Sequence, residues 1–170
     1  MGARIHANVA DIVRTRKGLA RKLARAGRKD DLLHEIGLYL VESSQNRFED
    51  QIGPDGKEWK VSGRVAASGG QTLVKDGHLR ASITYRLRGG SVEAGSNLIY
   101  AGVHQKGATI RAKTAKGLIF QVPGKPGDND VSYRRVQSVT IPARPYMGIN
   151  AADRREIREI VEDHLREALE

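Results

Sequence analysis

The residues best suited to acid–base or metal chemistry are scattered along this chain. The five histidines stand at positions 6, 34, 78, 104 and 164, and no two have the i, i+4 spacing with which one helix face binds a metal. The acidic residues at 156, 159, 162 and 163 fall on the polar face of an expected helix, whereas paired acid–base catalysis needs carboxylates in a cleft. There is no cysteine, which excludes thiolate ligands, disulfides and cysteine nucleophiles.

His104 and Gln105 form the most suggestive polar pair, but no nucleophile accompanies them. The chain also contains neither a G-x-S-x-G motif nor a P-loop. We therefore predict a protein that is not an enzyme and that binds no metal or cofactor.

The positive charge of the chain, +9 overall, is unevenly distributed. Residues 1–29 contain nine basic side chains and one acidic, whereas residues 151–170 contain four basic and seven acidic. A second local excess lies in residues 105–135, with seven basic and two acidic. This asymmetry indicates either a polyanionic partner or head-to-tail contact between copies of the chain.

Residues 8–27 have the apolar spacing of a helix, and we expect a basic N-terminal helix within residues 1–29, followed by a single α+β domain at 30–170. The basic side chains lie mostly off the apolar stripe. Two interpretations remain open: a surface for nucleic acid or an acidic partner, and an ordinary solvated face. The residues proposed for DNA contact are Arg14, Lys17, Arg21 and Arg25.

A second helix is expected from Asp30 or Asp31 to Phe48, because Asp is a good N-cap and apolar residues recur at helical spacing. With the first helix it would form an antiparallel hairpin. A turn is expected at residues 53–56, which read Gly-Pro-Asp-Gly. Trp59 is expected to anchor the following loop, with base stacking as the alternative, and residues 62–70 to be irregular and mobile.

Period-two alternation from Leu79 to Leu87 predicts a strand, and Gly89-Gly90 predicts the turn into a second strand at residues 91–96. The apolar run 98–103 is expected to continue the sheet. Residues 117–122 and 135–141 are expected to add strands. The predicted fold is thus α+β: an antiparallel sheet with an N-terminal helical hairpin and a C-terminal helix packed on it, and a long basic loop.

The loop at residues 106–126 carries Lys113 and Lys116 with no carboxylate nearby in sequence. It is either a solvated loop or one that becomes ordered on a partner. The chain leaves the last strand through Pro142 and Pro145, which hold Arg144 between two rigid residues. The Arg144 side chain is therefore expected to have a fixed direction, either toward a partner or into a salt bridge across this corner.

The final helix has the clearest pattern, with apolar residues from Ile157 to Leu169 at i, i+3, i+4 and i+7. Asn150 is the expected N-cap, and Asp153 lies near the positive end of the helix. His164 falls on the apolar stripe, where a hydrogen-bonded core histidine is expected more often than a ligand.

Several short motifs follow one another along the chain, and the more specific ones are Tyr100-Ala101-x-x-His104-Gln105-x-Gly107 and Ile141-Pro142-Ala143-Arg144-Pro145-Tyr146-Met147-Gly148. In order and spacing, over roughly residues 30–165, these motifs resemble the phage virion morphogenesis family, which includes the tail completion proteins of Mu-like phages.

This resemblance implies a structural virion protein of the tail completion or neck type, assembled in the host cytoplasm and acting as a ring where the tail joins the head. Its partners would be copies of itself, tail tube or terminator proteins and neck or connector proteins, with no membrane. The basic segment 1–29 would meet the acidic segment 151–170 of a neighbour, and the basic loop would face genomic DNA in the lumen or the next ring. The alternative is a DNA-binding protein that uses its basic N-terminal helix. The residues expected to contact partners are Tyr100, His104, Gln105, Lys106, Arg144 and Tyr146.

Overall fold

The structure is a computed structural model that describes residues 3–7, 29–122 and 132–167. It confirms an α+β fold with small antiparallel sheets and a C-terminal helix. The helix expected at residues 8–27 lies outside the described residues. In chain order the elements are β1 (Arg4–Ala7), α3 (Lys29–Asp50), α4 (Gly63–Ser68), α5 (His78–Ala81), β2 (Thr84–Arg88), β3 (Ser91–Gly95), α6 (Ala101–Lys106), β4 (Ala108–Arg111), β5 (Leu118–Val122), β6 (Ser132–Val136), β7 (Ser138–Ile141) and α7 (Ala151–Glu167).

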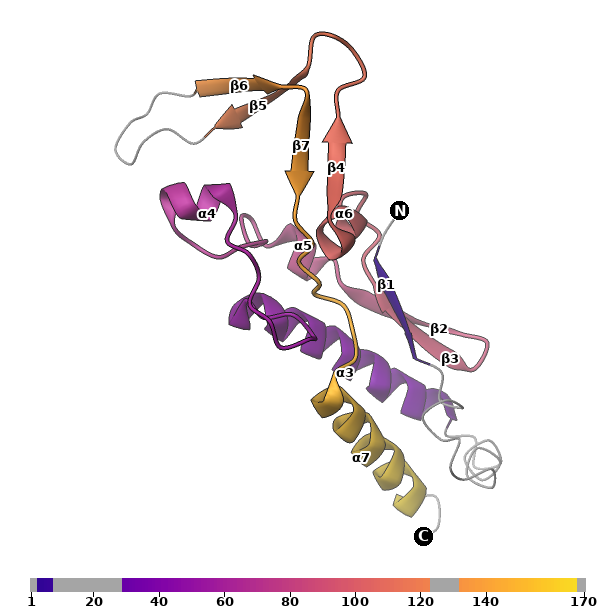
Figure 1. Cartoon of the computed structure of the whole chain (residues 1–170). Coiled ribbons are helices and arrows are strands. Elements are labelled where there is room, and N and C mark those ends of the chain that lie inside the picture. The colour runs from indigo at the N-terminus through magenta and orange to yellow at the C-terminus, as the bar shows by residue number, and fades with distance from the viewer. Residues whose placement is uncertain (1–2, 8–28, 123–131, 168–170) are drawn as a thin grey trace.

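Helix α3 is the central element, and it lies between the main sheet and α7 (Figure 1). Asp30 and Asp31 occupy its first turn, where negative charge stabilises the helix dipole. Its apolar stripe includes the fully buried Leu33, Ile36 and Leu40. Gly37 on the same face permits close packing, because a Cβ there would lie 2.3 Å from the Tyr85 ring of β2. The second predicted helix is therefore confirmed.

The main sheet has the order β1-β3-β2, and both pairings are antiparallel. The predicted hairpin across Gly89-Gly90 is confirmed, with Leu87 opposite Val92 and Tyr85 opposite Ala94. Strand β1 adds an edge that the sequence pattern did not predict, and Ala3 before it is buried in the core. Residues 4–7 thus form an edge strand of the main sheet.

Two segments expected to be strands are helical. Residues 98–103 lead into α6 instead of continuing the sheet, since a short apolar run does not distinguish strand from helix and Ala101 and Gln105 favour a helical turn. Gly107 ends α6 at φ +72°, and a Cβ there would lie 2.8 Å from the backbone nitrogen of Ala143. Residues 78–81 form α5, because the spacing of Leu79 and Ile83 also suits one face of a helical turn.

Residues 62–70, expected to be irregular, contain the short helix α4. The Ser62 hydroxyl accepts a hydrogen bond from the Val65 N–H at 3.3 Å and so caps its first turn. The predicted turn at residues 53–56 is confirmed, since the Gly56 N–H donates to the Gly53 carbonyl at 3.0 Å.

The single strand expected at residues 135–141 is two strands with different partners. Strand β6 pairs with β5, and β7 pairs with β4, so each pair is a two-stranded antiparallel sheet. We call residues 108–141 the arm. In Figure 1 the four strands of the arm, β4 to β7, rise away from α6 and lie at the end of the molecule opposite the far end of α7.

Helix α7 packs its predicted apolar stripe on α3, with Ile157, Ile160, Val161 and Leu165 buried. His164 on this stripe is hydrogen bonded as expected, with 2.6 Å between its Nε2 and Glu35 Oε2. Among the described residues, no helix combines the length and apolar character needed to cross a bilayer.

Candidate functional site

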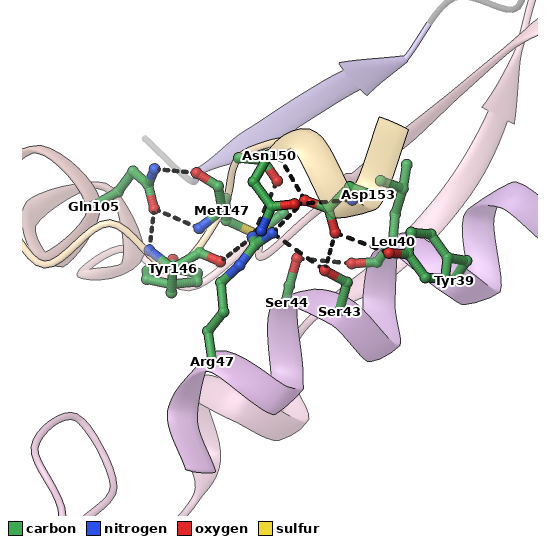
Figure 2. A network of polar contacts seen from close by, with 11 residues as sticks. Tyr39, Leu40, Ser43, Ser44, Arg47, Gln105, Tyr146, Met147, Asn150 and Asp153 are labelled. Atoms are coloured by element: carbon green, nitrogen blue, oxygen red, sulfur yellow. Dashed lines mark hydrogen bonds and ion pairs between the residues drawn. The ribbon is translucent and has the colours of Figure 1, made fainter. Parts of the chain in front are cut away.

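The corner at residues 142–148 joins the arm to α7, and side chains from α3 and α6 hold its backbone (Figure 2). Arg144 and Tyr146 lie in this corner, Gln105 comes from α6, and Arg47 comes from α3. Because these residues are far apart in sequence, the tertiary fold brings them together.

Arg47 is the centre of the polar network beneath the corner. It is 6% exposed, and its Nη1 donates to the carbonyls of Tyr146 and Gly148, both at 3.0 Å. Its Nη2 forms an ion pair with Asp153 Oδ2 at 2.7 Å and donates to the Ser43 hydroxyl at 3.2 Å. One guanidinium therefore links α3, the corner and the start of α7.

Asp153 completes the network from α7. Its Oδ1 accepts hydrogen bonds from the Tyr39 hydroxyl at 3.0 Å and from the Ser43 hydroxyl at 2.5 Å. Its Oδ2 also accepts from the Asn150 N–H at 2.7 Å, while the Asp153 N–H donates to Asn150 Oδ1 at 2.8 Å. This reciprocal capping confirms Asn150 as the N-cap.

Gln105 holds the corner from the other side. Its Oε1 accepts from the backbone N–H groups of Tyr146 and Met147, both at 3.0 Å, and its Nε2 donates to the Met147 carbonyl at 2.7 Å. Tyr146 is fully buried, and its hydroxyl donates to the Ala101 carbonyl at 3.2 Å. Gln105 and Tyr146 therefore face the interior, where they position the corner.

Trp59 is confirmed as an anchor of its loop. It is 6% exposed, and its Nε1 donates to the Pro145 carbonyl at 2.8 Å. Its ring packs edge-to-face on Phe48 of α3, with 5.3 Å between centroids. The loop after α3 is thus attached to the same corner.

Three of the predicted partner-contact residues lie together. Tyr100, His104 and Arg144 line one surface pocket of about 310 Å³ beside α4 and α5. The rings of Tyr100 and His104 meet edge-to-face with 5.9 Å between centroids, and the Arg144 N–H donates to the His104 carbonyl at 2.8 Å. Lys106 is exposed at the end of α6.

Arg144 has the fixed direction expected of a residue between two prolines. Its Nε donates to the Lys60 carbonyl at 2.7 Å, so a backbone carbonyl accepts from it in place of the carboxylate of a salt bridge. Burial, and then the Arg144 charge, lower the pKa of His104. His104 is therefore neutral at pH 7, and its buried Nδ1 has no hydrogen-bond partner in the described structure.

The pocket lacks a recognisable catalytic arrangement in the part of the chain that the structure describes. Ser62 lines it, but its hydroxyl is engaged in capping α4. Residues 3–7, 29–122 and 132–167 contain no cluster of three or more His, Asp or Glu side chains arranged to bind a metal ion.

The arm differs in character from the corner. Ile119 is 57% exposed, Phe120 38% and Tyr133 70%. Residues 108–141 contain six basic and two acidic residues, so the arm carries a net charge of +4. Lys113 and Lys116, predicted to contact DNA or the lumen, are exposed in the turn between β4 and β5. The other four predicted DNA-contact residues, Arg14, Lys17, Arg21 and Arg25, lie outside the described residues.

The sequence patterns did not assign Arg47 and Asp153 to a buried pair. A signal was present, because each is a charged residue on the apolar stripe of its helix, where an unpaired charge would be costly. Arg47 falls between Leu40 and Phe48 at helical spacing, and Asp153 is four residues before Ile157. Because Arg47 and Asp153 are 106 residues apart in sequence, the local patterns could not indicate that the two side chains pair with each other.

Comparison with known proteins gives one result that covers most of the chain. A model of the phage virion morphogenesis family matches residues 9–166. No curated protein and no solved structure matches. Since the matched segment includes α3, strands β2 and β3 of the main sheet, the corner, the arm and nearly all of α7, this chain belongs to the phage virion morphogenesis family.

Proposed function

We propose that this chain is a structural virion protein of the tail completion or neck type, which assembles with copies of itself into a ring where the tail joins the head. Membership of the virion morphogenesis family supports a structural role in phage assembly. The tail or neck position, the ring and the absence of catalysis are part of the proposal.

The observation that carries the proposal is the arm. A two-stranded hairpin is only marginally stable by itself in water, and β5–β6 exposes the apolar side chains of Ile119, Phe120 and Tyr133. Exposed apolar side chains beside the open outer edges of a two-stranded sheet favour association with another protein. This surface suits a protein that functions by assembly, because a partner protein would cover the exposed apolar side chains.

The corner gives the arm a defined direction. Hydrogen bonds from Arg47, Gln105 and Trp59 fix the backbone where β7 leaves the arm. We propose that Tyr100, His104, Lys106 and Arg144 contact an adjacent tail or neck protein, while Gln105 and Tyr146 support that contact from the interior.

The proposed function is tested by removing the gene from a phage or prophage that carries it and examining the particles by electron microscopy. We expect full heads and separate tails that fail to join, or tails with an abnormal end, with joining restored by the intact gene in trans. Normal infective particles from the deletion strain would contradict the proposal.

Direct DNA binding is the second candidate function, favoured by the nine basic residues within positions 1–29 and by the charge of the arm. Under this alternative the purified chain binds duplex DNA with an affinity that falls steeply with salt. Under the assembly proposal the purified chain binds DNA weakly, and a deletion strain still packages its genome. Fluorescence anisotropy of labelled duplex across a salt series distinguishes the two.

A further inference from the structure

The arm and the far end of α7 lie at opposite ends of this molecule (Figure 1). The arm carries a net +4 over residues 108–141. Helices α3 and α7 together contain six basic and twelve acidic residues, a net charge of −6. Opposite net charges on the arm and on these two helices favour contact between the arm of one copy and the helices of its neighbour.

The two acidic helices border a surface groove of about 390 Å³, which lies between α3 and the start of α7. Its floor includes Arg47 and Asp153, whose charges cancel in their buried ion pair. Its rim carries the exposed side chains of Glu42, Asp50 and Glu156. We call this the acidic groove; its net charge is therefore negative.

The rim carboxylates are available to a partner. Glu42, Asp50 and Glu156 form no ion pair with any other residue in the described part of the chain. Burial, and then the nearby Asp153 and Glu156 carboxylates, raise the pKa of Tyr39 in the groove to about 12, which is consistent with a negative potential there. Because the network beneath it is fully hydrogen bonded, the groove is organised before any partner arrives.

The arm has the complementary chemistry. Arg134 and Arg135 are exposed on β6, beside Tyr133, and neither forms an ion pair with a described carboxylate. Arg134 lies opposite Phe120 and Arg135 opposite Ile119, so each face of the hairpin combines a guanidinium with an exposed apolar side chain. The phosphate backbone of DNA would pair with the guanidinium groups but would leave the apolar side chains exposed. A groove on a protein can pair with the guanidinium groups and also cover the apolar side chains.

We propose that the arm of one copy binds the acidic groove of the next copy, with Arg134 and Arg135 pairing to Glu42, Asp50 and Glu156. This inference rests on the proposed function and identifies the partner of the arm. Arginine suits the role because its planar guanidinium forms paired hydrogen bonds with a carboxylate. The contact is heterologous, since different surfaces of each copy meet, and repetition of such a contact closes a ring when the rotation permits.

Proximity is tested by cross-linking, because the chain has no native cysteine. Tyr133→Cys places a thiol on the arm, and Asn46→Cys places one on the exposed edge of the groove. The two full-length variants carry different tags and are produced together in cells that assemble particles from a strain lacking the gene. We expect a mixed, reducible dimer in purified particles. Arg88→Cys, exposed at the β2–β3 turn, replaces Asn46→Cys in the control and should give no such dimer.

Specificity is tested by exchanging the charges. Arg134→Glu with Arg135→Glu should lower the yield of joined particles roughly tenfold or more, and so should Glu42→Arg with Glu156→Arg. All four changes in one chain restore opposite charge between the arm and positions 42 and 156, so they should recover most of the yield, while Asp50 keeps its negative charge. Lys57→Glu with Lys60→Glu, two exposed cations outside both surfaces, should leave the yield unchanged.

The outcomes separate the contact from its competitors. An unaffected yield in the groove variant, together with failure of the four-change chain to recover, would overturn the proposal and favour DNA as the target of the arm. Loss of yield only when Arg14, Lys17, Arg21 and Arg25 are reversed would assign the groove to the N-terminal segment instead. Particles that contain the chain but give no Tyr133–Asn46 dimer would also overturn it, whereas normal particles from the deletion strain would overturn the proposed function first.

Discussion

The corner and the arm of this protein differ in how far their polar and apolar groups are buried and paired within the chain. In the polar network around the corner, Arg47, Asp153 and Gln105 are buried or half-buried, and each has hydrogen-bond partners within the chain. In the arm, Arg134 and Tyr133 are exposed and meet no opposite charge or apolar core in the described structure. The difference indicates that the contacts around the corner stabilise the fold of this chain, whereas the arm is suited to bind a second molecule.

The largest effect on folding is expected in the polar network beneath the corner. Asp153→Ala should lower the free energy of unfolding by about 3–5 kcal/mol, because it leaves the Arg47 charge buried without its partner. Urea unfolding followed by circular dichroism measures this. The matched control is Glu49→Ala, which breaks the exposed ion pair with Arg80 and should change stability by about 0–1 kcal/mol. Equal effects of the two substitutions would contradict a structural role for the buried pair.

A smaller loss is expected from Gln105→Ala. The substitution removes the partners of two N–H groups and one carbonyl at Tyr146 and Met147, so we expect a loss of about 2–3 kcal/mol. Gln137→Ala is the control, since that exposed side chain makes one long hydrogen bond to the Ala115 carbonyl. If both variants unfold at the wild-type urea concentration, Gln105 does not hold the corner.

The pH dependence of stability tests the pocket next to the corner. Burial and Arg144 hold the pKa of folded His104 below its ordinary value of 6.5, so below pH 6.5 the unfolded chain takes up this proton more readily than the folded one. The contribution to folding stability is present above pH 6.5 and is lost as the pH falls toward the folded pKa. Melting temperatures between pH 5 and 7.5 should therefore fall less steeply for His104→Gln than for the wild type, and parallel curves would argue against a neutral, buried His104.

The smallest effect on folding is expected in the arm. Replacing Ile119, Phe120 and Tyr133 together by Ser should lower the free energy of unfolding by no more than about 1.5 kcal/mol in total, since each side chain is largely or partly exposed and a surface substitution changes stability by about 0.5 kcal/mol. The same variant should fail to join heads to tails. Cooperative melting near the wild-type temperature, combined with loss of joined particles, would support the contrast between the corner and the arm. A large fall in the melting temperature would show instead that the arm packs on its own chain.

Local patterns predicted much of this fold correctly. Helix α3, the β2–β3 hairpin and the capped start of α7 each depend on signals within a few residues, such as the Gly89-Gly90 turn and the Asn150 cap. The errors fall where a short apolar run suits two structures, as at residues 98–103. The division of residues 135–141 between two strands depends on the pairing partners β4 and β5, which local alternation cannot specify.

The candidate site was predictable only in part. Tyr100, His104 and Arg144 were singled out from short motifs, and the structure places them in one pocket. The same motifs did not reveal that Tyr146 faces the core, because burial depends on α3 and α6 packing over it. The acidic groove was also hidden, since Glu42 and Glu156 are 114 positions apart and meet only after α7 docks on α3.

The most direct test of the whole account is a cryo-electron microscopy map of the particle's neck and tail end, at a resolution that traces this chain. The account predicts a closed ring in which the β5–β6 hairpin of each copy lies in the groove between α3 and α7 of its neighbour. A map that lacks the chain at the head–tail junction, or that shows the hairpin against DNA with the groove facing solvent, would contradict it.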